Sequence, residues 1–221
     1  MKLMFNAILK FAVGLSLVAV LVFLPAGTLD YFGGWLFVVL LFVPMLALGI
    51  CLYVKAPKLL EKRLDSKEKQ KSQKGVVAIS GLSFLVGFVV AGLDFRFGLS
   101  YVPLWLQITA SAVLLVSYGL YAEVMRENAY LSRTVKVEEG QKVIDSRLYA
   151  VVRHPMYMAT LFLFLSIPLV LGSWWSLACF SLQLPALVVR IIGEEKLLEA
   201  ELEGYKEYKK KVKYRLIPFV W

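Results

Sequence analysis

Long uncharged apolar runs dominate the chain, and the charged residues gather in short stretches between them. Between Lys10 and Lys55 the only charged residue is Asp30, and no Asp, Glu, Lys or Arg occurs in residues 154–189. Apolar runs of about 18 or more residues are typical of helices that cross a membrane. The pattern predicts six apolar helices, at residues 7–24, 34–54, 76–93, 102–125, 156–171 and 174–192.

The predicted fold class is therefore all-α, a polytopic integral membrane protein of about six helices. Hydrophobic residues make up 59% of the 221 residues, more than the roughly half found in soluble domains. The first apolar run, nearly continuous from Phe11 to Leu24, is long for a signal-peptide core, so we expect a retained helix. We expect one integrated domain, with a four-helix transmembrane part (residues 1–125) and a cytoplasmic-facing part that includes a helical hairpin (residues 126–221).

Basic residues between the apolar runs predict the orientation, because cytoplasmic connections are rich in Lys and Arg. The connection at residues 25–33 has none, whereas 55–74 has eight, 126–155 has six and 194–221 has seven. We therefore expect both termini and the basic segments in the cytoplasm, with the protein in the inner or cell membrane if the host is prokaryotic. The net charge of +9 is then explained by topology and anionic lipid, so nucleic acid is not expected as a partner.

The last two apolar segments are short, about 17 residues each, which is the lower limit for a span. Gly172 and Ser173 should break the helix between them, so a tight helical hairpin that returns to the cytoplasm is predicted. After it, apolar residues recur at helical spacing among charges and predict an amphipathic helix that continues from the sixth segment. These residues are Leu197, Leu198, Leu202, Tyr205 and Tyr208.

The only histidine lies where a charged segment becomes apolar, in "RHPMY" (residues 153–157). Proline is favoured at the first position of a helix, and the residue before it avoids helical geometry, so His154 should precede a helix that begins at Pro155. The unpaired N–H groups of such a helix start suit a carboxylate or phosphate. On these residues alone, a local cap and a binding site are both open interpretations.

A second candidate lies near the end of the sixth apolar segment. Arg190 and Glu194 are four residues apart, so they share one face of a helix. A charge at membrane depth is a functional hypothesis by default, and a structural pair near the interface is the alternative. Glu195 points to another face and is expected to be a solvated charge, and Tyr205 and Tyr208 are expected to be aromatic anchors at the membrane surface.

Several function classes are disfavoured by what the chain lacks. One histidine and scattered acids predict no metal site. No P-loop or GxGxxG occurs, which disfavours a soluble nucleotide-binding fold, and no GxSxG accompanies the histidine. Both cysteines lie in apolar runs without CxxC spacing, so no redox pair is expected.

Three pieces in this order resemble the isoprenylcysteine carboxyl methyltransferase family, which is related to the phospholipid methyltransferases. They are "RHPMY" (153–157), the R-x-x-x-EE of 190–195, and "GYKEYKKKVKYRLIP" (204–218). The resemblance begins at "AEVMRENAYLS" (122–132) and runs to the last residue. It implies S-adenosyl-L-methionine as cofactor, bound at the cytoplasmic side, and a lipophilic substrate from the bilayer.

The resemblance also implies roles for particular residues. Arg190 would face the substrate, and Glu123 and Arg126 would lie at the substrate entrance. The residues implied to bind the cofactor are Gln141, Lys142, Val143, Ile144, Tyr149, His154, Pro155, Met156, Tyr157 and Glu194. The chain departs from the family's pattern at Glu138, at Arg147-Leu148 and at Ala159, so we expect the loop at "SRLY" (146–149) to differ.

The chemistry favours an acid acceptor mildly. A carboxylate is ionised near pH 7 and needs no general base, and Arg190 could hold it bidentately. The predicted function is methylation of a lipophilic, carboxylate-bearing substrate of the isoprenylcysteine type. Methylation of a phospholipid or another small lipid is the alternative, and a sterol-reductase-like membrane reductase or a non-catalytic scaffold or transporter is more distant.

Overall fold

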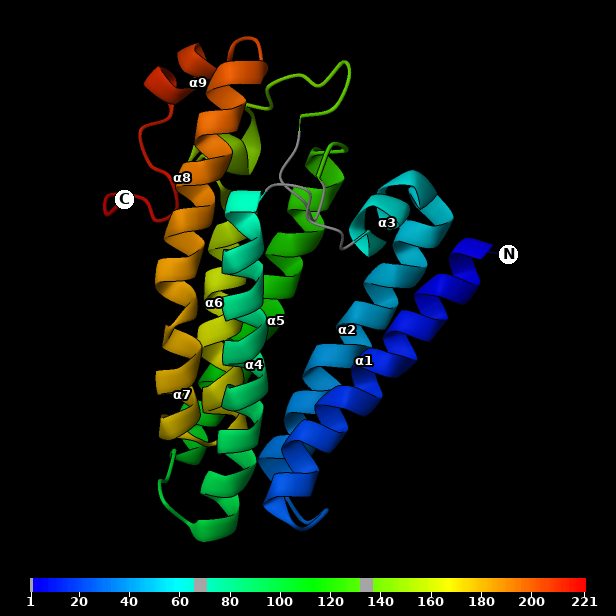
Figure 1. Ribbon diagram of the computed structural model, residues 1–221, viewed down its shortest axis with the longest axis vertical. Coiled ribbons are helices and arrows are strands. Elements are labelled where there is room, and N and C mark those ends of the chain that lie inside the picture. Colours follow the sequence, from blue (N-terminus) through cyan, green and yellow to red (C-terminus); the bar gives the residue numbers. More distant parts are fainter. Residues whose placement is uncertain (1, 66–70, 132–136) are drawn as a thin grey trace.

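The computed structural model describes residues 2–65, 71–131 and 137–221 and is all-helical, with 77% helix and no strand in the described part. It has nine α-helices there, and the long ones run side by side in an elongated bundle, with the short α3 and α9 near one end (Figure 1). Their bounds are α1 Lys2–Ala26, α2 Phe32–Lys55, α3 Pro57–Leu64, α4 Lys71–Phe97, α5 Leu104–Glu127, α6 Pro155–Leu171, α7 Trp174–Ser181, α8 Gln183–Glu201 and α9 Tyr205–Lys211. A single 3₁₀ turn, η1, covers Arg147–Ala150.

All six predicted apolar segments are helical, and five candidate spans meet the length and apolarity needed to cross a membrane. These spans are α1, α2, most of α4, α5, and α7 with α8 taken together as residues 174–201. Helix α6 has 17 residues, so at 1.5 Å per residue it is about 25 Å long and falls short of the roughly 30 Å hydrocarbon core. A polytopic membrane protein was therefore correctly predicted, with one short apolar helix inside the bundle.

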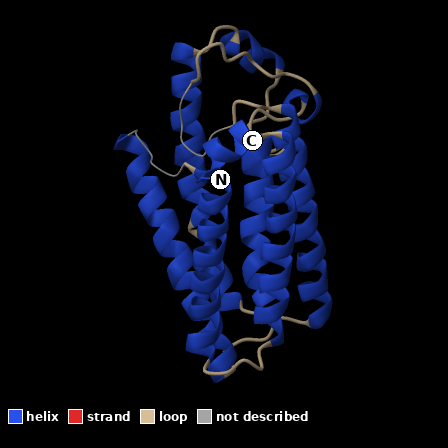
Figure 2. Ribbon diagram, turned by 90° about the vertical axis from the view of Figure 1, so that its right-hand side faces the viewer, coloured by secondary structure: helices blue, strands red, loops and turns tan. Residues whose placement is uncertain are grey.

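Both chain termini lie in the upper half of the view in Figure 2. The largest group of buried apolar residues lies at the opposite end of the bundle. It joins α1, α2, α4, α5, α6 and α7, with Phe37 and Phe180 fully buried. Close helix approach contributes, because a Cβ at Gly92 of α4 would lie 2.5 Å from the Val22 carbonyl oxygen of α1. Small residues at such contacts let membrane helices pack closely.

The predicted hairpin between α6 and α7 is present. Gly172 ends α6 in the left-handed conformation (φ 83°), and Ser173 begins α7 by accepting a hydrogen bond from the Ser176 N–H (3.0 Å). The Ser173 hydroxyl also donates to Asp94, a carboxylate only 1% exposed. Asp94 accepts from the Ser100 N–H as well (2.7 Å), so the turn is fastened to the end of α4.

Two breaks in the last third of the chain were not predicted. The sixth apolar segment is interrupted at Leu182, which separates α7 from α8. The prediction of one amphipathic helix continuing from it is wrong, because α8 ends at Glu201 and Gly204 takes a left-handed conformation (φ 81°) before α9 begins. The turn keeps Leu202, Tyr205 and Tyr208 in one buried cluster that a straight helix would spread along its length.

The connector predicted at 55–74 is partly helical, since α3 fills 57–64, while residues 66–70 lie outside the described residues. Leu59 and Leu60 of α3 are buried, so this helix is docked and is not wholly solvated as expected. Figure 1 places α3 beside the end of α2, at the end of the bundle where α9 also lies.

Candidate functional site

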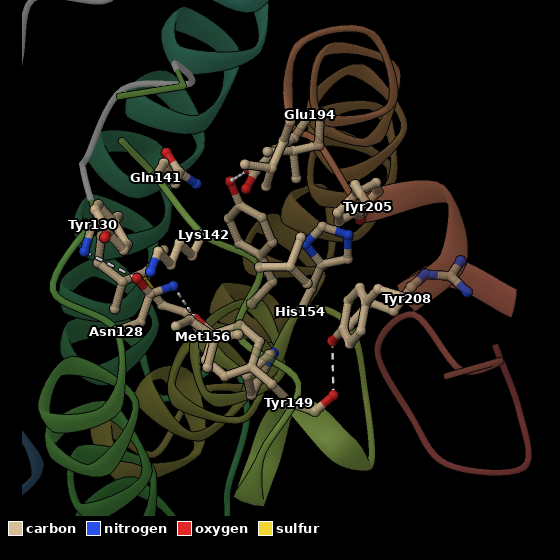
Figure 3. Close-up of a pocket in the computed structure, with 18 of the residues that line it drawn as sticks. Asn128, Tyr130, Gln141, Lys142, Tyr149, His154, Met156, Glu194, Tyr205 and Tyr208 are labelled. Atoms are coloured by element: carbon tan, nitrogen blue, oxygen red, sulfur yellow. Dashed lines mark hydrogen bonds between the residues drawn. The ribbon is translucent and has the colours of Figure 1, made fainter. Parts of the chain in front are cut away.

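An open pocket lies where α8, α9 and the start of α6 meet the segment after α5. Arg190 and all ten residues implied to bind a cofactor line it (Figure 3). Those ten are Gln141, Lys142, Val143, Ile144, Tyr149, His154, Pro155, Met156, Tyr157 and Glu194. The fold therefore brings together side chains that are up to 53 positions apart in sequence, from Gln141 to Glu194.

The start of α6 is built as its sequence predicts, with His154 as the N-cap residue and Pro155 at the first helical position. The His154 side chain makes no capping hydrogen bond. The backbone N–H groups of Arg153 and His154 instead donate to the Tyr214 and Arg215 carbonyls, both at 2.9 Å. The C-terminal segment thus holds the chain as it enters α6, and the imidazole is free to turn toward α8.

Glu195 is the centre of a buried ionic cluster, so the expectation that it is a solvated charge is wrong. Its side chain is 4% exposed, and it accepts hydrogen bonds from Arg153 Nε (2.7 Å) and Arg215 Nε (2.9 Å). His154 Nε2 lies 3.3 Å from the same carboxylate. Helical geometry does place Glu195 on a different face from Glu194, but the C-terminal segment and the start of α6 cover that face.

Arg153 is a structural member of this cluster. Its side chain is 5% exposed, and Nη1 donates to the carbonyls of Val212 (2.9 Å) and Lys213 (3.0 Å). A buried ion pair is tolerated when further hydrogen bonds satisfy the remaining donors, and the two carbonyls do this here. The cluster therefore fastens α8, the start of α6 and the C-terminal segment around one side of the pocket.

Tyr157 connects the two charged residues that sequence spacing placed on one face of α8. The Tyr157 hydroxyl donates to Glu194 Oε2 (2.5 Å) and accepts from Arg190 Nε (2.9 Å). A phenol has one donor and can accept at the same oxygen, so both bonds form together. Arg190 and Glu194 are thus bridged through a tyrosine of the neighbouring helix, and all three line the pocket.

Tyr149 and Tyr208 form a second polar chain at the base of the pocket (Figure 3). The Tyr149 hydroxyl accepts from Asn128 Nδ2 (2.9 Å), and the Tyr208 hydroxyl donates to the Tyr149 carbonyl (2.7 Å). Burial raises the pKa of both tyrosines well above the usual value, so both stay neutral hydrogen-bonding groups.

Tyr205 stands out because its hydroxyl is buried and, among the described residues, has no hydrogen-bond partner. Burial also raises the pKa of this hydroxyl. Tyr205 and Tyr208 are 4% and 5% exposed and line the pocket, so the expectation that they anchor the membrane surface is wrong. Buried polar atoms are normally hydrogen-bonded, and a ligand bound in the pocket could provide the partner for this hydroxyl.

Glu123 and Arg126, implied to lie at a substrate entrance, are outside the lining of this pocket. They form a bidentate pair on the last turn of α5, with Nη2–Oε1 and Nε–Oε2 distances of 2.7 and 2.9 Å. Arg147 Nη1 also donates to Glu123 (2.8 Å). Arg147 has a φ of 43°, a left-handed conformation that favours glycine, and it lies in the loop that we expected to differ from the family's pattern.

Sequence reasoning missed several residues that line the pocket, among them Asn128, Tyr130, Tyr205 and Tyr208, and it missed the burial of Glu195 beside it. The two tyrosines carried a signal, since they share helical spacing with Leu198 and Leu202, which also line the pocket. No pattern singled out Asn128. No group of three or more His, Cys, Asp or Glu suited to a metal occurs in the part of the chain that the structure describes.

One comparison with known proteins bears on this region. Residues 105–203, from the start of α5 to the break after α8, match the family model for phospholipid methyltransferase. That family is related to the isoprenylcysteine methyltransferases. No curated protein matches the chain significantly. The matched segment contains the predicted cofactor residues, Arg190 and Glu195, and it ends before Tyr205 and Tyr208.

Proposed function

We propose that this chain is an S-adenosyl-L-methionine-dependent methyltransferase of the membrane that acts on a lipophilic acceptor. The observation that carries the proposal is the convergence of the ten predicted cofactor residues and Arg190 on one pocket. The family match over 105–203 supports methyl transfer and a lipid-like acceptor. The acceptor we favour bears a carboxylate, as in isoprenylcysteine-type O-methylation.

The donor set of the pocket fits this cofactor. Glu194 supplies a carboxylate for the cofactor's ammonium group, and the N-terminus of α6 at Pro155 suits its carboxylate. The Tyr205 hydroxyl, which has no hydrogen-bond partner among the described residues, can serve a ribose hydroxyl or a ring nitrogen. Apolar walls from Val143 and Leu198 suit the adenine ring. When bound, S-adenosyl-L-methionine would supply an electrophilic methyl group on a sulfonium.

The protein's own contribution would be positioning and the exclusion of water, because displacement at a methyl group needs an aligned nucleophile. Arg190 would hold the acceptor carboxylate, with the Tyr157 hydroxyl restricting the guanidinium through Nε. Since Tyr157 bonds to Glu194 as well, one side chain would set the distance between the cofactor's ammonium group and the acceptor. An ionised carboxylate requires no proton transfer, so no general base is assigned.

A phospholipid amine is the second candidate acceptor, and the family match over 105–203 favours it. An amine must be neutral to attack, so it would have to lose a proton before or during transfer. Arg190 disfavours a cationic amine nearby but stabilises the phosphate of the same headgroup. The two acceptors therefore predict the same cofactor site and different products.

Transfer of isotope-labelled methyl from the cofactor into a host lipid extract tests the proposal. We expect a labelled lipid whose label is released as methanol by mild alkali, which marks a methyl ester. Label that resists alkali would place the methyl group on nitrogen, sulfur or an ether oxygen and reject the carboxylate acceptor. No labelled lipid, from protein that binds the cofactor, would reject methyl transfer to a lipid.

A further inference from the structure

Helix α3 contacts the segment after α5 and the start of α6, which both contribute to the pocket. It lies more than 70 positions before the nearest predicted cofactor residue. Lys62 reaches the segment that follows α5, and Arg63 Nη1 lies 3.5 Å from the sulfur of Met156, which lines the pocket. The helix itself is held firmly. Only Ala56 separates it from α2, and the ammonium group of Lys10 in α1 donates to the carbonyl of Leu64.

Lys62 contacts described residues on both sides of positions 132–136 in that segment. Its Nζ donates to the Ala129 carbonyl (3.3 Å), lies 6.0 Å from the centre of the Tyr130 ring, and forms an ion pair with Glu138. The side chains of Lys62 and Glu138 are 28% and 17% exposed, so solvent screens the pair only in part. One ammonium group thus makes a hydrogen bond, a cation–π contact and an ion pair with this segment, which restricts the segment's position relative to α3.

A short turn connects Glu138 to Gln141, which lines the pocket. The Glu138 N–H donates to the Gln141 side-chain oxygen (2.9 Å), and the Gln141 N–H donates to the Glu138 carbonyl (3.0 Å). Gln141 to Ile144 are the four consecutive residues that form one wall of the pocket. The position of that wall therefore follows from the position of Glu138, which Lys62 holds.

We propose that Lys62 is a positioning residue of the site, and that through Glu138 it holds the wall formed by Gln141–Ile144 in a binding-competent arrangement. The first two membrane helices are thereby coupled to the pocket, to which they contribute no lining residue in the described part of the chain. The effect on ligand affinity rests on the proposed function. The effect on the wall itself does not, since it is a property of the protein without ligand.

Hydrogen–deuterium exchange of the ligand-free protein tests the positioning role. In Lys62→Met we expect faster exchange of the amides of residues 137–144, with α5 amides unchanged. Lys62→Arg, which keeps the charge, should exchange like the wild type, and so should Lys58→Met, which alters an exposed lysine one turn earlier on α3. Wild-type exchange in Lys62→Met would overturn the proposal.

A second variant keeps the test decisive if Lys62→Met folds poorly. Glu138→Gln removes the carboxylate charge alone and should accelerate exchange in the same residues. The double variant should add little to either single change, because both remove one interaction. Additive effects would mean that Lys62 and Glu138 act separately, which also overturns the proposal.

Calorimetry with S-adenosyl-L-methionine gives the functional result. If the wall adopts its binding-competent arrangement less often, the apparent affinity for the cofactor falls in proportion. The Kd should therefore rise about threefold to fivefold in Lys62→Met, the upper part of the range for loss of one exposed or partly exposed ion pair. An unchanged Kd beside faster exchange would show that the wall does not contact the cofactor, which overturns the functional part. Failure of the wild type to bind would reject the proposed function and leave the exchange result to decide the positioning role.

Discussion

Removal of the Glu195 carboxylate should destabilise the protein more than removal of any surface carboxylate, because four basic side chains converge on it: Arg153, His154, Lys209 and Arg215. Glu195→Ala leaves the guanidinium of Arg153, 5% exposed, without its counter-charge. Breaking a buried pair in this way costs about 3–5 kcal/mol. Arg153 keeps its two carbonyl acceptors, so we expect the lower end, about 3 kcal/mol.

The assay is thermal unfolding of purified protein in detergent. At about 2–4 °C per kcal/mol for a chain of this size, a loss of about 3 kcal/mol lowers Tm by about 6–12 °C. Glu199→Ala is the matched control, four residues later on the same helix. Glu199 pairs with Lys209, and the two side chains are 34% and 35% exposed, so its loss should cost about 1 kcal/mol or less.

Glu195→Gln separates charge from shape in this cluster. The amide keeps the volume and one acceptor oxygen, so Tm should fall between the wild type and Glu195→Ala. Affinity for S-adenosyl-L-methionine should fall in both variants, because His154 loses the group that orients it beside the pocket. A Tm of Glu195→Ala within 2 °C of the wild type would refute the buried cluster as a source of stability.

Three further predictions follow from the geometry of the pocket. Arg190→Ala should abolish methyl transfer while the cofactor Kd stays within about threefold, measured by labelled transfer and calorimetry; equal loss of both would reject Arg190 as the acceptor's partner. Tyr205→Phe should leave Tm unchanged and raise the cofactor Kd about threefold to tenfold, the effect of one lost hydrogen bond. Tyr208→Phe should lower Tm, because the Tyr208 hydroxyl donates to the Tyr149 carbonyl. The reverse pattern would contradict the site. Burial raises the pKa of Tyr149 and Tyr208 above the unfolded value of about 10. Their contribution to stability is therefore fully present below pH 10 and is lost as the pH rises above it. Tm should fall in strongly alkaline buffer, and it should fall less in the variant with both tyrosines changed to Phe.

The membrane helices were predictable because each rests on local composition. An uncharged run of sufficient length must be helical in a bilayer, so all six segments appear, and Gly172 and Pro155 mark ends that their backbone preferences dictate. The breaks at Leu182 and Gly204 were missed although Pro185 and Gly204 are local helix-breaking signals, because the apolar spacing continues across both. At Gly204 the turn folds Tyr205 back onto Val143 and Leu198, contacts that spacing alone does not contain.

The residues of the site also divide into those that local sequence motifs indicate and those that depend on contacts distant in the sequence. The His154–Tyr157 element, Arg190 and Glu194 line one pocket, and sequence could group them because their motifs occur in a recognisable order and Arg190 and Glu194 share a helix face. Their roles stay predictions. Glu195 was misjudged because its neighbours Arg153 and Arg215 are 42 positions before it and 20 after it. The role of Lys62 was out of reach for the same reason, since its partner Glu138 is 76 positions away.

Calorimetric titration of the wild-type protein with S-adenosyl-L-methionine tests the central claim most directly. The protein should bind one cofactor per chain, and Tyr205→Phe, which changes one buried hydroxyl that lacks a described partner, should bind more weakly with its fold intact. Absence of binding by wild-type protein whose Tm shows that it is folded would contradict the assignment of this pocket to a methyltransferase.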